Sequence, residues 1–205
     1  AGPVIEQSQL DELLKKIECY AAASTLFVLS GSIPQGISTD IYAVIIQLAH
    51  KKGAQVLLDA DGELFREAIV EMPDIIKPNR SELLEYAGMD DDASIHKLLE
   101  TVESFHERGI DLIAVSMGED GAVFYINSLK AKCPAIKVKA HSSVGAGDAM
   151  VAALAYAWSE EMSDADTIRL CMATSAGAVT TIGTKPPNRK KILELIKQVV
   201  METWE

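Results

Sequence analysis

Three small residues and one carboxylate, Gly145-Ala146-Gly147-Asp148, stand directly before a long apolar segment whose spacing predicts a helix. Glycines let the backbone approach a ligand closely, and a helix start presents unpaired N–H groups and the positive end of its dipole. The segment is therefore typical of an anion cradle, in which Asp148 could take a proton from a hydroxyl that attacks a bound phosphoryl group. The alternative is a tight turn in which Asp148 only stabilises the helix, by about 0.3–1 kcal/mol.

The other common phosphate-binding patterns are absent. Neither GxxxxGK[ST] nor GxGxxG followed by an acidic residue occurs in the sequence. The formal net charge is −11, so a phosphate must be held by local groups rather than by the overall field, and nucleic acid is disfavoured as a partner.

Four further polar loops follow predicted strands, and ligands of open α/β sheets bind beyond the carboxyl ends of the strands. The loops are GSIPQG (31–36), DADGE (59–63), KPNRSE (77–82) and SMGEDG (116–121). Two of them, KPNRSE and SMGEDG, also have a plainer interpretation. Asn79 and Glu82 form a helix-capping pattern, Lys77 could be a solvated surface lysine, and Asp120-Gly121 could make a hairpin turn.

Apolar periodicity predicts alternating strands and helices. Strands are expected at 25–30 (buried), 55–60, 74–78 and 111–117, with hairpin-like strands at 121–127 and 131–140. Helices are expected from Ser8 to about 23, from a cap at Ser38 or Thr39 to Gly53, at 63–70, from Ser81, at 93–108, and near 146–159, 164–180 and 187–203. This order predicts one α/β domain over residues 1–205, a doubly wound, mostly parallel sheet with helices on both faces.

The composition is that of a globular protein. Of the 205 residues, 48% are hydrophobic, and no apolar run approaches the length of a membrane span. Cys19, Cys133 and Cys171 lie far apart without metal-binding spacing, which indicates a reducing, cytoplasmic setting.

The string VGAGDAMVA resembles the GAGD signature of the PfkB, or ribokinase-like, carbohydrate kinases. It is joined, in the family's order, by LSGSIPQGIS, VLLDADGELFREAI, IIKPNRSEL and VSMGEDGAVFY, so the resemblance covers nearly the whole chain. SGSIPQG and KPNRSE look most like the branch that phosphorylates sugar phosphates. The resemblance implies a ribokinase-like large domain and ATP- and Mg²⁺-dependent transfer of the γ-phosphoryl group to fructose 6-phosphate, fructose 1-phosphate or tagatose 6-phosphate.

The same resemblance assigns roles to residues. Asp148 matches the catalytic base, and Gly145, Ala146 and Gly147 match the anion hole. Several further groups are implied. They are Lys77 and Asn79 near the nucleotide phosphates; Asn79 and Glu82 in indirect magnesium placement; Ser116, Gly118 and Gly121 in the nucleotide loop; Met172 and Ala176 at the adenine; and Ser142, Val144, Ala178, Thr181 and Gly183 at a K⁺ site.

The sequence departs from the family pattern in two places. His141 and Ser143 stand where this branch often has Asn or Gln and then Thr. The family's N-terminal segment, with its sugar-binding aspartate and small β lid, is not visible, so the chain is expected to be impaired when alone. Family members commonly dimerise through that lid, which implies a homodimer for a longer protein. Two alternatives remain open: a kinase of an unphosphorylated sugar or nucleoside, and a non-catalytic ATP-binding fragment.

Overall fold

The computed structural model describes residues 3–183 and 185–204, and its contacts divide the chain into two compact units. Unit 1 is Ala1–Ile110 and unit 2 is Asp111–Glu205.

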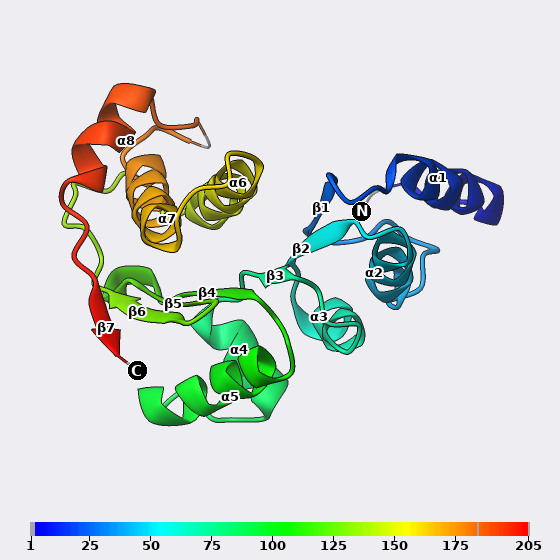
Figure 1. The fold of residues 1–205 in the computed structure, drawn as a ribbon, viewed down its shortest axis with the longest axis horizontal. Coiled ribbons are helices and arrows are strands. Elements are labelled where there is room, and N and C mark those ends of the chain that lie inside the picture. Colours follow the sequence, from blue (N-terminus) through cyan, green and yellow to red (C-terminus); the bar gives the residue numbers. More distant parts are fainter. Residues whose placement is uncertain (1–2, 184, 205) are drawn as a thin grey trace. The chain divides into compact units, whose positions relative to one another are not determined.

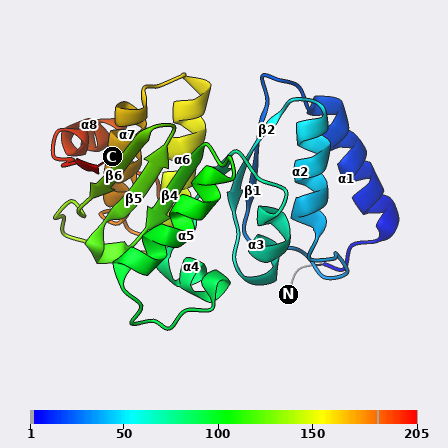
Figure 2. The same ribbon diagram turned by 60° about the horizontal axis from the view of Figure 1, so that its bottom comes forward.

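Unit 1 is built around parallel strands. Its elements are α1 (Gln7–Tyr20), β1 (Leu26–Ser30), α2 (Ile41–Lys51), β2 (Gln55–Asp59), α3 (Gly62–Ile69), β3 (Ile75–Ile76), α4 (Arg80–Ala87) and α5 (Ile95–Glu107). Strands β1 and β3 both pair with β2 in parallel. Helices α2 and α3 pack against β2, and α1 packs on α2 (Figures 1 and 2).

The register of these strands decides which side chains meet at their carboxyl ends. Ser30 lies opposite Asp59, and Leu58 lies opposite Ile76. The N–H of Lys77 then donates to Leu58 O at 3.1 Å, which continues the ladder past β3. The register therefore places Ser30, Asp59 and Lys77 side by side at the carboxyl ends of β1, β2 and β3.

Unit 2 is built around antiparallel strands. Its elements are β4 (Leu112–Ser116), the 3₁₀ turn η1 (Gly118–Asp120), β5 (Ala122–Ile126), β6 (Leu129–Cys133), α6 (Ala146–Ser159), α7 (Asp164–Ala178), α8 (Arg189–Ile196) and β7 (Glu202–Trp204). The strands pair in chain order, β4 with β5, β5 with β6 and β6 with β7. Helix α7 contacts β5 as well as α6 and α8 (Figure 1).

The end of the chain differs from the sequence prediction. A helix was predicted to continue to residue 203, but α8 ends at Ile196 and residues 202–204 form β7 instead. Strand β7 exists because it pairs with β6 and because the ring of Trp204 packs edge-on against Tyr125, with 6.0 Å between the centroids. The predicted strand 131–140 is also wrong in length, since β6 ends at Cys133, directly before Pro134, which has no N–H for a ladder.

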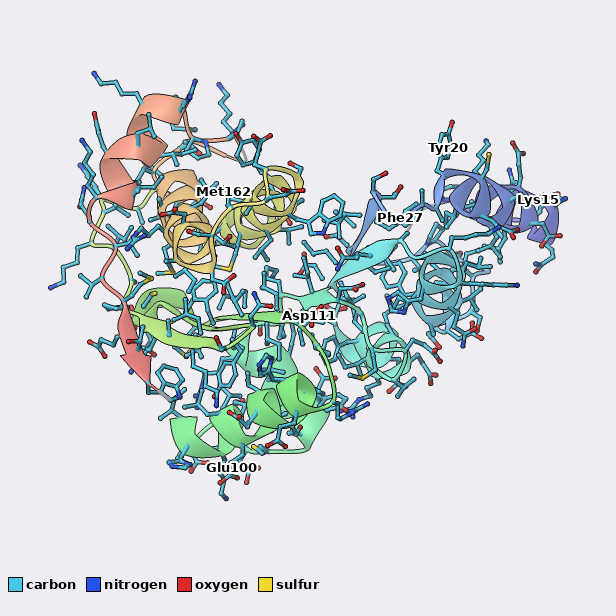
Figure 3. All side chains as sticks on the ribbon, viewed as in Figure 1. Lys15, Tyr20, Phe27, Glu100, Asp111 and Met162 are labelled. Carbon is cyan, nitrogen blue, oxygen red and sulfur yellow. The ribbon has the colours of Figure 1, made fainter. Side chains whose placement is uncertain are left out.

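The first part of unit 1 is less buried than predicted. Strand β1 was expected to be buried, yet Val28 is 43% exposed and only Leu29 is fully buried. Helix α1 buries none of its residues, and Tyr20 at its end is 73% exposed and projects outward (Figure 3).

Two helix starts also differ from the prediction. Helix α1 begins at Gln7 with Glu6 as its N-cap, two residues before the predicted cap Ser8, because Gln9 accepts a hydrogen bond from the N–H of Glu6 at 2.9 Å. Helix α2 begins after Asp40 rather than after Ser38 or Thr39, and Ser38 contributes its carbonyl to the N–H of Ile41. Within the described residues, no helix is long and apolar enough to cross a membrane.

The three thiols should differ sharply in reactivity. Cys19 is exposed, whereas Cys133 and Cys171 are buried. Burial raises the pKa of Cys133 to about 12, with the charge of Glu202 adding to the effect, and burial also raises the pKa of Cys171. Since the thiolate is the reactive form, we expect one thiol to react rapidly with a disulfide reagent at pH about 8 and all three to react in denaturant. Rapid modification of a Cys19→Ser variant under native conditions would contradict this burial.

Candidate functional site

The carboxyl ends of β1, β2 and β3 carry a chain of polar contacts centred on Asp59. Lys77 Nζ lies 2.9 Å from Asp59 Oδ1, and Ser30 Oγ donates to Asp59 Oδ2 at 2.9 Å. The Lys77 side chain is only 6% exposed and that of Asp59 is 16% exposed. Lys77 is therefore a buried, paired cation, and its interpretation as a solvated surface lysine is wrong.

Backbone contacts hold the corner where β1 runs into the loop 31–36. The N–H of Gly31 donates to Asp59 O at 3.0 Å. The hydroxyl of Tyr42, from α2, lies 3.2 Å from Ser30 O and 3.1 Å from Gly31 O. Burial, and secondarily the charge of Asp59, raises the pKa of Tyr42, so its hydroxyl stays a proton donor at neutral pH.

Asn79 and Glu82 form the capping box at the start of α4. The N–H of Glu82 donates to Asn79 Oδ1 at 2.9 Å, and the N–H of Asn79 donates to Glu82 Oε2 at 2.8 Å. The Asn79 amide nitrogen also donates to Glu82 Oε1. The capping interpretation is thus confirmed, and it leaves open an additional role in magnesium placement.

The electrostatics of this part of unit 1 act on Glu82. Burial raises the pKa of its carboxyl, while the Asn79 N–H and the charge of Lys77 act in the opposite direction. The negative charges of Asp59 and Asp61 raise it further. The charge of Lys77 therefore offsets part of the rise in the pKa of Glu82.

The same residues can be tested against the requirements of Mg²⁺. Among the described residues, no group of three or more His, Cys, Asp or Glu side chains could hold a metal ion. Mg²⁺ usually keeps several waters and uses one or two carboxylates together with substrate phosphates. The residues fit an ion held mainly by nucleotide phosphates and water, with Glu82 contacting that water, and they do not fit a cage made by the protein alone.

In unit 2 the predicted anion cradle lies at the start of α6. Gly145 is the N-cap with φ of +86°, and the helical ladder begins with the N–H of Ala149, which donates to Gly145 O at 2.9 Å. The N–H groups of Gly147 and Asp148 therefore lie in the first turn, where intrahelical acceptors are lacking. Asp148 is exposed, and Ser175 of α7 fixes this turn by donating to Ala146 O at 3.0 Å.

The two segments predicted for a monovalent cation come together. The N–H groups of His141 and Ser142 donate to Val179 O at 2.7 and 3.4 Å. The Thr181 hydroxyl lies 2.8 Å from Ala178 O, so this carbonyl already has a protein partner. Val144 is 62% exposed, and Gly183 lies in the left-handed region with φ of +67°. These contacts join the segment at His141 and Ser142 to the end of α7 at Val179, and the cation itself stays a prediction.

The loop 116–121 is the hairpin turn between β4 and β5. The N–H of Met117 donates to Gly121 O at 2.8 Å, which closes the turn after Ser116. Gly121 has φ of +96°, and a Cβ atom there would lie 1.9 Å from Cys133 O. Gly118 has open space around it. The hairpin interpretation is confirmed, and Gly121 is required by the protein's own backbone.

The candidate adenine residues lie on α7. Met172 is buried, being 5% exposed, and Ala176 is partly exposed one helical turn further on. Side-chain size alone does not separate an adenine wall from helix packing, so this role stays a prediction.

Sequence reasoning missed Ser30, Tyr42 and Asp59 as individual site residues. The available signal was position, because Ser30 and Asp59 are the last residues of two adjacent strands and Lys77 follows the third. Tyr42 gave no signal of this kind, because it stands inside an apolar helical pattern.

Comparison with known proteins places this geometry in context. The family model described as pfkB family carbohydrate kinase matches residues 3–191. A 1-phosphofructokinase from Rhodobacter capsulatus is 38% identical over 206 residues, covering 99% of this chain and 63% of the relative. A tagatose-6-phosphate kinase from Staphylococcus epidermidis is 29% identical over 200 residues, covering 97% of this chain and 64% of the relative. The chain thus spans less than two thirds of the length of these relatives.

A solved structure supports the fold class. Phosphofructokinase-2 from Escherichia coli in complex with potassium matches with a TM-score of 0.89 at 22% identity, covering 97% of this chain and 65% of that structure. This likeness confirms the predicted ribokinase-like α/β fold.

The backbone requirement at Gly121 can be tested with a matched glycine. Gly121→Ala should lower the free energy of unfolding by about 3 kcal/mol or more, because the methyl group meets Cys133 O and φ is unfavourable. Gly118→Ala, in open space at φ of +60°, should cost only about 1–2 kcal/mol. Urea unfolding measures both values, and equal losses would refute the close contact.

Glu82 should leave a signature in the pH dependence of stability. Its pKa is raised above the ordinary 4.5, so the folded state retains a proton that the unfolded state loses, and stability falls as pH rises through this window. Glu82→Gln lacks this step. Its stability relative to the parent should therefore increase as the pH rises above the ordinary pKa of 4.5. Unfolding curves across that range measure the difference, and a pH-independent difference would contradict the raised pKa.

Proposed function

Because the chain belongs to the pfkB family of carbohydrate kinases, we propose that it forms the large domain of a sugar-phosphate kinase. The reaction is transfer of the γ-phosphoryl group of ATP to a hydroxyl of the sugar phosphate. The observation that carries the proposal is the position of Asp148, an exposed carboxylate in the first turn of α6, where the N–H groups of Gly147 and Asp148 lack intrahelical acceptors.

The start of α6 supplies both parts of the chemistry. Asp148 takes the proton from the attacking hydroxyl, which makes the oxygen a better nucleophile as it approaches the phosphorus. Charge gathers on the peripheral oxygens of the transferring group, and the N–H groups at Gly145 and Gly147 are proposed to stabilise that charge. The N–H of Ala146, which was also predicted for the anion hole, already donates to Ser143 O at 3.3 Å. Both effects act at one turn of helix, so the proton acceptor and the anion hole keep a fixed separation.

Unit 1 is proposed to supply the positive charge of Lys77 and a carboxylate, Glu82, that is held in one orientation. Lys77 is proposed to face the nucleotide phosphates, with Asn79 beside it. Glu82 is proposed to contact the water shell of a magnesium ion, which would neutralise phosphate charge when bound. Glu82 keeps its orientation through the capping box with Asn79.

Unit 2 is proposed to hold the nucleoside. The hairpin at Ser116, Gly118 and Gly121 offers backbone groups, while Met172 and Ala176 offer apolar surface to the adenine. A K⁺ ion is proposed between the segments that carry Ser142 and Thr181, supported by the contacts to Val179 O and by the potassium named with the Escherichia coli structure.

The acceptor is proposed to be a phosphorylated ketohexose. Fructose 1-phosphate is the first candidate, since the 1-phosphofructokinase relative is 38% identical, and tagatose 6-phosphate and fructose 6-phosphate follow. We further propose a cytoplasmic setting, which the three free cysteines support, and a homodimer formed by the full-length protein.

The test is a phosphoryl-transfer assay on the full-length protein with each sugar phosphate, ribose and a nucleoside. We expect one sugar phosphate to be turned over with ATP and Mg²⁺, and Asp148→Asn to lower kcat about 10²–10⁴-fold because the base is lost. Asp164→Asn is the matched control. It changes a first-turn acid on the neighbouring helix and should leave kcat within about twofold.

The possible outcomes separate the candidates. Full activity of Asp148→Asn would refute the role of base. Turnover of ribose or a nucleoside alone would favour the kinase of an unphosphorylated acceptor. Binding of ATP without turnover of any acceptor would favour a non-catalytic nucleotide-binding protein.

A further inference from the structure

The carboxylate of Asp59 bridges two strands that flank its own. One oxygen contacts Lys77 Nζ, which follows β3, and the other accepts from Ser30 Oγ at the end of β1, both at 2.9 Å. Both oxygens are therefore engaged, each by a different neighbouring segment. A change at either partner alters the position of the shared carboxylate.

Lys77 has unused hydrogen-bonding capacity. An ammonium group has three N–H donors, and among the described residues Asp59 is the one that forms an ion pair with it. The Lys77 side chain is only 6% exposed, so its remaining N–H donors belong to a buried ammonium group. A lysine is a flexible chain bearing a point charge, so the place of its ammonium group depends on what anchors it. Asp59 is that anchor.

Asp59 is itself held in place by contacts that involve the last residue of β1 and the residue after it. The Gly31 N–H donates to Asp59 O at 3.0 Å, and the buried Tyr42 hydroxyl contacts the carbonyls of Ser30 and Gly31. The start of the loop 31–36 and the ammonium group of Lys77 are thus joined through one residue. Each bond restricts the freedom of the next.

We propose that Asp59 is a positioning residue, which places Lys77 for the nucleotide phosphates and makes that placement depend on the Ser30–Gly31 corner. The inference rests on the proposed kinase function. Asp59 acts through Lys77 and needs no contact with the substrate. Loss of its charge leaves a buried cation without its partner, so the ammonium group moves or becomes hydrated.

The test is a double-mutant cycle in the full-length protein. Asp59→Asn should raise the KM for ATP–Mg²⁺ about tenfold or more, because small displacements of binding groups are costly. In a Lys77→Met background, the same substitution should change this KM by less than about twofold. An unchanged KM in Asp59→Asn, or equal effects in both backgrounds, would overturn the proposal.

A second carboxylate in the same sheet provides the matched control. Asp74 lies before β3, is 19% exposed, and accepts from the N–H of Val56 at 2.7 Å and from Gln55 Nε2 at 3.2 Å, while also contacting His50. Asp74→Asn should lower stability and leave the KM for ATP–Mg²⁺ within about twofold. A rise equal to that of Asp59→Asn would show a general structural effect and overturn the proposal.

Ser30→Ala keeps the inference testable if Asp59→Asn does not fold. It removes only the second partner of Asp59 and no charge, and it should raise the KM for ATP–Mg²⁺ about two- to fivefold in the parent but not in the Lys77→Met background. No rise in the parent would overturn the proposal.

Failure of the proposed function is recognised separately. If the parent protein phosphorylates no acceptor, equilibrium binding of ATP–Mg²⁺ replaces KM in the same cycle. The predicted non-additivity then applies to the dissociation constant, and additive effects again overturn the proposal.

Discussion

The positive charge of Lys77, buried at the end of β3, is the constraint on which the parallel half of the protein depends. A buried ammonium group is costly unless a carboxylate and further hydrogen bonds compensate it. The compensation comes from Asp59, which reaches Lys77 because β1, β2 and β3 run in parallel and in register. A slip of one residue in the pairing would turn these side chains to the other face of the sheet, so the site forms only in the observed register.

In unit 2, whose strands are antiparallel, the start of α6 is exposed. The hydroxyl of Ser175, on α7, donates a hydrogen bond to Ala146 O, and the N–H of Ala149 donates to Gly145 O, which closes the first turn of α6. These contacts fix the turn through its carbonyl groups, and the Ala146 N–H donates to Ser143 O, so the first-turn N–H groups that can face a ligand are those of Gly147 and Asp148. The turn is thus rigid before anything binds, and an anion hole needs that property, since donors that had to reorganise would stabilise less.

Much of the fold and part of the candidate site could be predicted from the sequence, because the patterns that indicate them lie within short segments of the chain. Helices α6 and α7 were expected within two residues of their ends, since apolar periodicity indicates both helices and small residues mark the start of α6. Asn79 and Glu82 likewise specified their own capping box. Burial of Lys77 could not be predicted, because it depends on residues far away in the chain. Strand β7 was missed for the same reason, as it exists only through pairing with β6 and its sequence has helical character.

Strand β7 also bears on how unit 2 behaves in concentrated solution. The outer edge of β6 carries backbone donors and acceptors that would otherwise invite a strand from another molecule. Residues 202–204 occupy that edge, and the ring of Trp204 secures them against Tyr125. The edge that remains is β7 itself, which is only three residues long and therefore presents few unpaired backbone groups to a strand of another molecule.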